Sequence, residues 1–160
     1  MESFIPITHM YTDKSGHTRF KEKKLPLEPK IGLGSVGHFS SLFVNQVLDD
    51  NVGDIKLQFA VTPVPENFEG DGPKLAHTAP RRQLVITLDG YLGFKSCDVD
   101  KVDVQHQTII TRGKILLADD LEGAGHVWSF LKDDNGVMYP WVRCYAHLGE
   151  EYDHFISKLK

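Results

Sequence analysis

Hydrophobic and polar residues alternate along several short stretches in the middle and the C-terminal part of the chain. The alternation is clearest in residues 55–62 and recurs in residues 102–111. Apolar positions at every second residue are typical of strands that are buried on one face. Turn-forming residues at 112–114 and 133–136 separate such stretches. The chain therefore predicts an all-β sandwich or barrel built from many short strands.

Two hairpins are expected from this pattern. Residues 91–96 follow a strand that ends at Gly90, so they are the expected partner of that strand. Residues 137–145 are expected to return from the Asn-Gly turn at 133–136, because Asn and Gly tolerate the positive φ of a tight turn. Further short strands are predicted at residues 17–20, 115–118 and 126–130.

Residues 1–35 are polar and show few periodic apolar positions. They predict a turn at 11–16 and an extended segment at 25–29, where two prolines disfavour helix. We expect this arm to pack on the barrel or on a partner subunit, and an arm beside open sheet edges favours a homodimer. Residues 38–48 fit helical spacing only in part, so helix and strand both stay open there.

The C-terminal segment has the spacing of a short amphipathic helix. Its apolar residues fall at i, i+3, i+4 and i+7, namely Tyr152, Phe155, Ile156 and Leu159. The predicted organisation is an arm over residues 1–35, one β-barrel over 36–146 and the helix within 147–160.

Composition and charge exclude several classes of protein. The chain of 160 residues has the size of one domain with a substantial core. A net charge of −4 without a basic tail argues against nucleic-acid binding. No apolar run has the length of a membrane span and no secretory signal is visible, so we expect a cytoplasmic protein without a membrane partner. Cys97 and Cys144 are then expected to be free thiols.

The stretch from His77 to Gly90 carries the most distinctive candidate chemistry. It begins with polar and titratable residues and continues into an apolar, β-rich segment that the glycine ends. The spacing of His77, Ala79, Gln83 and Gly90 is similar to the first motif of the cupin superfamily, which has His, His, Glu and Gly at these positions. The resemblance implies a double-stranded β-helix, the jelly-roll barrel of cupins.

A second motif carries the same resemblance. Cupins have a glycine that is followed by a histidine on a later strand, and Gly113 and His126 are similar to that pair. Small single-domain cupins, whose functions are mostly open, also show a His-x-Ala-Pro-Arg-Arg-Gln run like residues 77–83 here. They further show a Leu-Leu-Ala segment that ends in two acids, like residues 116–120.

Metal-binding cupins generally hold iron, manganese, nickel or zinc with three histidines and one carboxylate. At the matching positions this chain has Ala79 in place of a histidine and Gln83 in place of the acid. The resemblance therefore implies no firm cofactor, and at most one Fe, Zn or Ni ion on His77, Gln83 and His126. Alternatively, the two histidines serve as acid, base or hydrogen-bond donor in a pocket, or are satisfied core residues.

Side-chain alternation along the strands predicts the lining of the pocket. If Gln83 and His126 point inward, the other inward residues are Arg81, Val85, Thr87, Trp128 and Phe130. Arg82 then points outward, and the six remaining histidines, including His147, are expected to be surface or structural residues.

An inward Arg81 requires an anion nearby. The anion is either a substrate carboxylate or a structural partner, Asp119 or Asp120. An acid beside His126 would orient the imidazole ring and make it a candidate general acid or base. Asp119 is accordingly included among the candidate substrate-binding residues, together with Arg81, Thr87, Trp128 and Phe130.

These residues predict a small-molecule enzyme that works inside a barrel. The leading hypothesis is an acid–base isomerase, lyase or cyclase acting on an organic acid or a polar aromatic metabolite, with His77, His126 and Gln83 as catalytic residues. One alternative is a metal-dependent oxygenase of the iron type. The other is a ligand-binding or structural cupin that performs no reaction.

Overall fold

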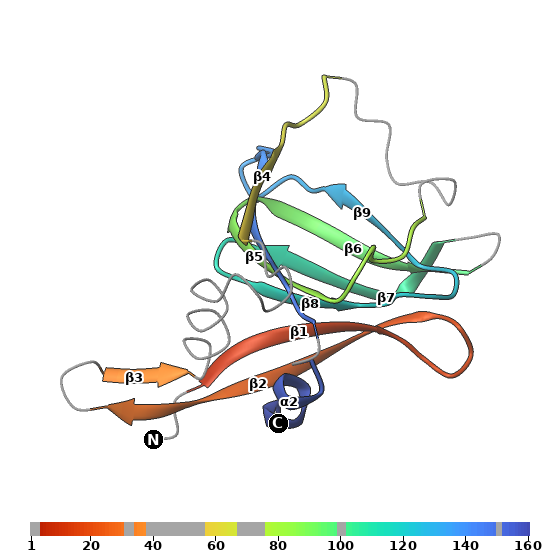
Figure 1. Ribbon diagram of the computed structural model, residues 1–160. Helices are drawn as coiled ribbons and strands as arrows, with labels where there is room; N and C mark the ends of the chain where they lie inside the picture. Colours follow the sequence, from red (N-terminus) through yellow and green to blue (C-terminus); the bar gives the residue numbers. More distant parts are fainter. Residues whose placement is uncertain (1–3, 31–33, 38–56, 67–75, 99–101, 150–151) are drawn as a thin grey trace.

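The computed structural model describes residues 4–30, 34–37, 57–66, 76–98, 102–149 and 152–160. In this part of the chain the structure is mostly β, with a short helix at the C-terminus (Figure 1). The strands are β1 (Phe4–Thr12), β2 (Thr18–Lys30), β3 (Gly34–Gly37), β4 (Leu57–Thr62), β5 (Gln83–Asp89), β6 (Tyr91–Cys97), β7 (Val102–Thr111), β8 (Ile115–Asp119), β9 (His126–Phe130) and β10 (Trp141–His147). The helix is α2 (Tyr152–Lys158). The all-β prediction is confirmed.

The described strands form two sheets. The large sheet has seven strands in the order β3-β2-β1-β8-β5-β10-β4, and the small sheet has three in the order β7-β6-β9. The strand pairs are antiparallel except for β1 and β8, which are parallel. A single antiparallel bridge between His77 and His126 continues the small sheet beyond β9.

Apolar side chains fill the layer between the two sheets. This inner cluster takes Val85 and Leu116 from the large sheet, and Phe94 and Phe130 from the small one. Residues that face inward from β5 and β8 alternate with residues that face the opposite side, as the period of a strand requires. The two sheets therefore share one core.

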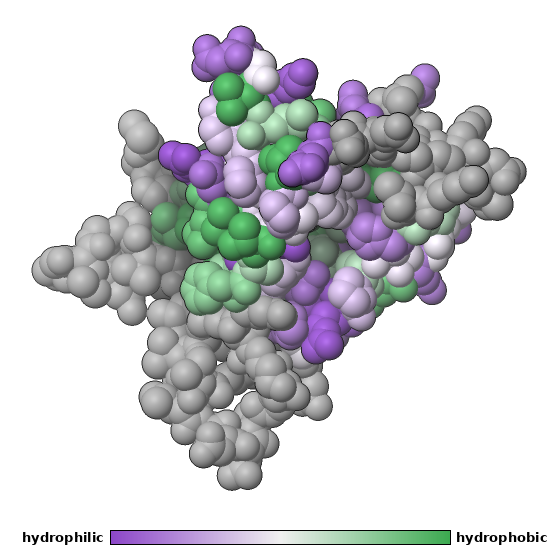
Figure 2. Space-filling view, turned by 90° about the horizontal axis from the view of Figure 1, so that it is seen from above, coloured by the Kyte–Doolittle hydropathy of each residue, from purple (hydrophilic) through white to green (hydrophobic). Residues whose placement is uncertain are grey.

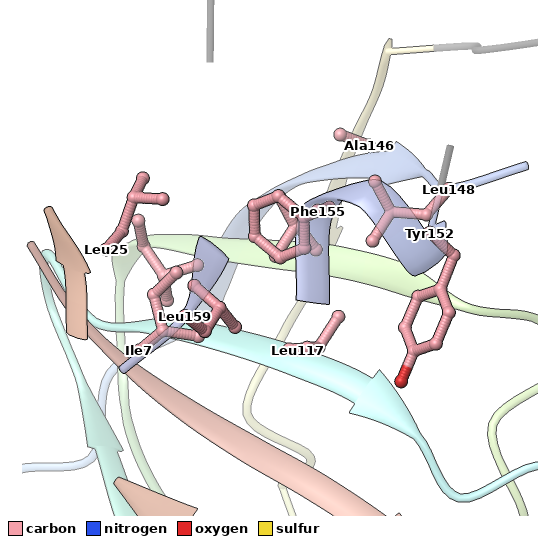
Figure 3. Close-up of a cluster of buried hydrophobic side chains, with 10 residues drawn as sticks. Ile7, Leu25, Leu117, Ala146, Leu148, Tyr152, Phe155 and Leu159 are labelled. Carbon is pink, nitrogen blue, oxygen red and sulfur yellow. The ribbon is translucent and has the colours of Figure 1, made fainter. Parts of the chain in front are cut away.

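The outer face of the large sheet is covered by α2 (Figures 1 and 3). Its buried residues Tyr152 and Phe155, together with Leu159, pack against Ile7 and Leu117. The predicted amphipathic helix is therefore confirmed, and it closes the side of the sheet that the small sheet leaves open. No helix in the described ranges is long and apolar enough to cross a bilayer.

The first predicted hairpin is wrong, because the chain changes sheet at Gly90. β6 pairs with β7 and β9 and does not pair with β5. Gly90 has φ 134°, and a Cβ atom there would lie 3.3 Å from Trp141 Cδ1. A buried glycine in this conformation lets the chain turn a corner where a tight hairpin turn would keep it in one sheet.

The second predicted hairpin has its turn but not its strands. Asp133 accepts hydrogen bonds from the amides of Asn135 and Val137 at 2.9 Å, and Gly136 has φ 78°. Of these turn residues only the glycine has positive φ. β9 and β10 lie in different sheets, and residues 137–140 are not strand. The turn therefore serves as a crossover between the sheets.

The N-terminal region is part of the sheet. β1 pairs with β2 on one side and with β8 on the other, so the expected arm supplies three strands of the large sheet. The predicted turn at 11–16 forms where Asp13 accepts amide hydrogen bonds from Ser15 and His17. The extended segment 25–29 lies within β2, and the strand predicted at 17–20 is the start of that longer strand.

β4 departs from the expected burial. Phe59 and Val61 were expected to face the core, yet they are 71% and 64% exposed on this edge strand. In the view of Figure 2, hydrophobic residues form small groups among hydrophilic ones. Cys97 and Cys144 are buried free thiols, as expected. The segment 38–48, where helix and strand stayed open, lies outside the described residues.

Candidate active site

A cavity of about 440 Å³ lies between the two sheets. Cavities of this size commonly hold small-molecule ligands. Its lining comes from strands of both sheets and from the segment that precedes β5. The lining residues are Met10, His77, Ala79, Pro80, Arg81, Gln83, Val85, Phe94, Leu116, Ala118, His126, Trp128, Trp141, Arg143, Tyr145 and His147.

His77 and His126 lie side by side at this cavity. Their backbones exchange two hydrogen bonds, of 3.0 Å and 2.9 Å, and their ring centroids are 4.6 Å apart. Gly125 makes this approach possible, because it has φ 75° and a Cβ atom there would lie 2.5 Å from the carbonyl oxygen of His77. The glycine before His126 is therefore a packing requirement of the site. His77 is exposed, whereas His126 is 4% exposed.

Asp120 holds the His126 ring from beneath the cavity. The distance from His126 Nδ1 to Asp120 Oδ2 is 2.6 Å, and the aspartate is completely buried. The carboxylate also accepts hydrogen bonds from the Thr18 hydroxyl at 2.9 Å and from the Ala79 amide at 3.3 Å. An ionised carboxylate can only accept, so Nδ1 carries the proton in this arrangement. Nε2 is then the ring nitrogen that remains for a ligand in the cavity.

The expectation that an acid lies beside His126 is therefore met by Asp120. The contribution of Thr18 had no signal in the sequence, because this residue is distant along the chain and begins β2. Ala79, the residue at the position of a cupin histidine, donates its amide to this carboxylate. Its small side chain is 5% exposed and lines the cavity.

The donor set does not fit a tightly held metal ion. Within the described ranges, no three side chains of His, Cys, Asp and Glu gather closely enough to ligate one. The predicted ligands His77, Gln83 and His126 all line the cavity, but they would offer two imidazoles and one neutral amide. The carboxylate that is near, Asp120, is hydrogen-bonded to His126, is completely buried and is not part of the cavity lining. We therefore derive no reaction step through a metal.

Alternation along β5 places most of the predicted lining correctly. Arg81, Gln83 and Val85 line the cavity. Thr87 is completely buried and accepts a hydrogen bond from Trp141 Nε1 at 3.3 Å, so it supports the cavity wall and is not part of the lining. On β9, Trp128 lines the cavity, and Phe130 lies in the inner core behind it with ring centroids 5.5 Å apart.

Asp119 lies away from the cavity, so its assignment to substrate binding needs correction. Its carboxylate receives hydrogen bonds from His9 at 3.3 Å, from Arg82 at 2.8 Å and from the Tyr152 hydroxyl. The predicted Arg–Asp pair therefore exists, but it uses Arg82 and not Arg81. The reason is the period of the strand, because adjacent residues point to opposite faces of the sheet.

Four further lining residues come from β10 and were missed. They occur at every second position and are Trp141, Arg143, Tyr145 and His147. Of these, His147 was expected to be a surface or structural residue. The alternation within residues 137–145 could have indicated them. However, the strand was predicted to begin at residue 137 and to form a hairpin across the turn at 133–136, so its inward face was not identified; β10 instead pairs with β5.

The cavity is rich in positive charge. Arg81 and Arg143 line it, and its lining contains neither Asp nor Glu. Arg81 Nη1 lies 3.4 Å from His147 Nδ1. Arg143 contacts hydroxyl and carbonyl oxygens and the faces of Trp141 and Tyr145. Among the described residues, neither guanidinium forms an ion pair with a carboxylate, so both charges are available to an anionic ligand.

Aromatic rings form the apolar part of the wall. The centroids of Trp128 and Trp141 are 5.0 Å apart, and those of Phe94 and Trp141 are 5.7 Å apart with an edge-to-face arrangement. Phe94 also lies against His126, at 5.6 Å between ring centroids. A ligand in this cavity would therefore meet an apolar, aromatic surface beside the cationic groups.

Comparison of the chain with models of protein families, with curated proteins and with solved structures found no match in any of the three.

Proposed function

We propose that this chain is a cupin-type β-barrel enzyme that performs acid–base chemistry on a small organic acid. Support for the barrel comes from the path of the chain. From β4 onward, the chain leaves the large sheet and enters the small sheet at His77. It then returns to the large sheet in β5. It next runs through β6 and β7 of the small sheet, through β8 of the large one, and through β9 and β10 in the same alternation. Eight segments in two facing sheets with this path are typical of a jelly roll.

The observation that carries the proposed activity is the pair of His126 and Asp120 at a cavity with two guanidiniums. Asp120 fixes the ring by a 2.6 Å contact to Nδ1, and the cavity lining includes the ring itself. A positioned imidazole is the commonest general acid or base in enzymes. Because Asp120 holds Nδ1, the ring is oriented to accept a proton from a ligand at Nε2 and to return it.

The reaction follows from these positions. Arg81 or Arg143 binds the carboxylate of the acid, and Nε2 of His126 removes a proton from the carbon next to an activating carbonyl group. The electron pair of that C–H bond moves into the carbonyl and forms an enolate, which a guanidinium or the amide of Gln83 stabilises. The imidazolium then returns the proton to another atom, which gives an isomer, or to a leaving group, which gives elimination.

A solvent-isotope experiment tests this activity without knowledge of the physiological substrate. We expect the protein in D2O to accelerate deuterium exchange at the CH2 group of phenylpyruvate, followed by NMR. His126→Gln should lower the enzymatic rate by about 100-fold or more, the usual contribution of a general base. Asp120→Asn should also lower it, because the ring loses the charged partner that orients it.

The matched control is His106→Gln, which changes an exposed histidine on β7 outside the cavity lining and should leave the exchange rate unchanged. Equal rates for the wild type and His126→Gln would contradict the proposal. Binding of phenylpyruvate without exchange would instead favour a ligand-binding protein that performs no reaction.

A further inference from the structure

We propose that the ligand of this cavity is a flat organic dianion, a dicarboxylate with one carboxylate on Arg143 and the other on Arg81. This rests on the proposed function, for which it names the substrate class. It also assigns a second anion subsite to Arg143. This residue lies on β10, the strand that pairs with β5, whereas the Arg-Arg motif that first indicated an anion directly precedes β5.

Arg143 is held in place before any ligand arrives. Its Nη1 donates to Thr62 Oγ1 at 2.8 Å and to the carbonyl of Trp141 at 3.2 Å, while its Nε donates to the Tyr145 hydroxyl. The guanidinium carbon lies 3.9 Å from the centroid of the Trp141 ring. Five N–H donors are present in a guanidinium, so the donors of Nη2 remain for a ligand. A stacked and hydrogen-bonded arginine of this kind loses little freedom when it binds a carboxylate.

Arg81 supplies the second cationic group at the other end of β10. It contacts His147 at 3.4 Å, and His147 is four residues beyond Arg143 on a strand whose alternate side chains face the cavity. At a rise of about 3.3 Å per residue, the Cα atoms of these two positions are about 13 Å apart. The two guanidiniums also have different neighbours, since Arg81 contacts His147 while Arg143 is held by Thr62, Trp141 and Tyr145. One carboxylate that binds at either arginine is expected to leave the other charge without an anion.

The charge balance of the cavity favours two carboxylates over one. Two arginines contribute two fixed positive charges, and the lining contains no acid to offset them. Asp120 lies beneath the lining and is engaged by His126, Thr18 and Ala79. Arg143 is partly buried, and a partly buried charge without a counterion is unfavourable. Arg81 is exposed and is expected to gain from a charge-assisted, bidentate bond to a carboxylate.

The aromatic rings in the cavity lining favour a ligand with an aromatic body. Trp128 and Trp141 present aromatic surface, and Tyr145 lies between Arg143 and His147 on the same face of β10. His126 faces the same cavity from the opposite sheet. A ligand held at both ends would therefore present its middle to the imidazole, where proton transfer is proposed.

Isothermal titration with the three benzenedicarboxylates and with benzoate tests the inference on the wild-type protein. The three isomers place two carboxylates at three separations on one aromatic ring. We expect at least one isomer to bind at least tenfold more tightly than benzoate. The monomethyl ester of that isomer should fall back to the affinity of benzoate, because it keeps the shape of the ligand and removes one charge.

Variants assign the two ends. Arg143→Gln should weaken the preferred dicarboxylate by at least tenfold and benzoate by less than threefold, since benzoate can still use Arg81. Arg81→Gln should give the same result. Arg143→Lys should give an intermediate loss, because lysine keeps the charge but lacks the planar donors that bind a carboxylate in a bidentate way. Arg112→Gln removes a charge that is 73% exposed and paired with Asp89, so it controls for net charge and should change neither affinity.

The ligand comparison on the wild type does not depend on the folding of any variant. Equal affinities for benzoate and all three dicarboxylates would overturn the dianion and leave the acid–base proposal to its isotope test. An equal loss of dicarboxylate binding in Arg112→Gln and Arg143→Gln would also overturn it. Failure of every carboxylate to bind would overturn both the dianion and the proposed organic-acid substrate.

Discussion

Asp119 and Asp120 are neighbours in the chain but belong to two different regions of the molecule. Asp119 lies on the outer side of the large sheet, where His9, Arg82 and Tyr152 all donate to its carboxylate. Asp120 lies on the inner side and is the completely buried partner of the His126 ring. The outer carboxylate joins the C-terminal helix to the sheet, and the inner one orients a side chain of the cavity.

The two consecutive arginines repeat this division. Arg82 pairs with Asp119 at 2.8 Å and lies over the ring of Tyr152 at 4.3 Å, whereas Arg81 lines the cavity and contacts His147. On the outer side Arg82 and Asp119 are paired with each other. On the inner side neither Arg81 nor Arg143 has a carboxylate partner among the described residues. Under the proposed function, the outer network serves stability and the inner one serves binding.

The largest expected contrast is in the free energy of unfolding. Among the described residues, Asp120 is the carboxylate bonded to His126, and Asp120→Ala leaves the ring N–H and the Thr18 hydroxyl buried without this acceptor. Each buried donor left without a partner costs about 1–3 kcal/mol, so we expect a loss of about 4 kcal/mol for the two together. Asp119→Ala breaks bonds that are partly exposed to water, so we expect about 2 kcal/mol. Urea unfolding measures both values.

The assignment of Asp119 to the outer network and of Asp120 to the inner site would be wrong if Asp119→Ala destabilised the protein more than Asp120→Ala. The same assignment requires that the Asp119→Ala variant still catalyse the proposed isotope exchange, because Asp119 is outside the cavity lining.

The next contrast concerns pH. Burial raises the pKa of Asp119, but the bonds from His9, Tyr152 and Arg82 lower it by more, so the pKa lies below its usual value. The stability from this group is present above the unfolded pKa and is lost as the pH falls below about 4. Burial and then the bond to Asp119 raise the pKa of Tyr152, so its contribution is lost as the pH rises above about 10.

Urea unfolding across a pH series tests both limits. Asp119→Asn should flatten the loss of stability in acid, and Tyr152→Phe should flatten it in alkali. Tyr152→Phe keeps the aromatic ring in the hydrophobic cluster between the helix and the sheet. The substitution therefore removes the hydroxyl without changing the packing. Unchanged pH dependence in either variant would remove that group from the outer network.

The smallest contrast compares the two arginines. Arg82→Gln should cost about 1 kcal/mol, because the side chain of its partner Asp119 is only 13% exposed while that of Arg82 is 44% exposed. Arg81→Gln should not measurably change the unfolding midpoint, since it has no carboxylate partner in the described chain. A larger loss for Arg81→Gln would show that the inner arginine also has a structural role.

The sequence predicted local properties better than the pairing of strands. Turn residues and alternation located most strands, and the apolar spacing located the helix that Phe155 anchors. Pairing was wrong at Gly90 and at residues 137–140 because a turn sequence does not specify whether the chain stays in its sheet. β1 was missed, since its long-range parallel partner cannot be inferred from local periodicity.

For the site, spacing brought together His77, Gln83, His126 and Arg81, which all line one cavity. It could not supply Arg143, because the inward face of β10 depends on its pairing with β5. It also could not distinguish Asp119 from Asp120 without knowing which face of β8 was inward. The homodimer and the cytoplasmic location stay predictions.

The parallel pairing of β1 with β8 has a consequence for synthesis of the chain. β1 is made first, but the strand that covers its open side, β8, is made only after most of the sequence has left the ribosome. Until then the nascent β1–β2 hairpin presents an unpaired edge that other chains could extend. Exposure of that edge during translation is therefore expected to lower the yield of folded protein.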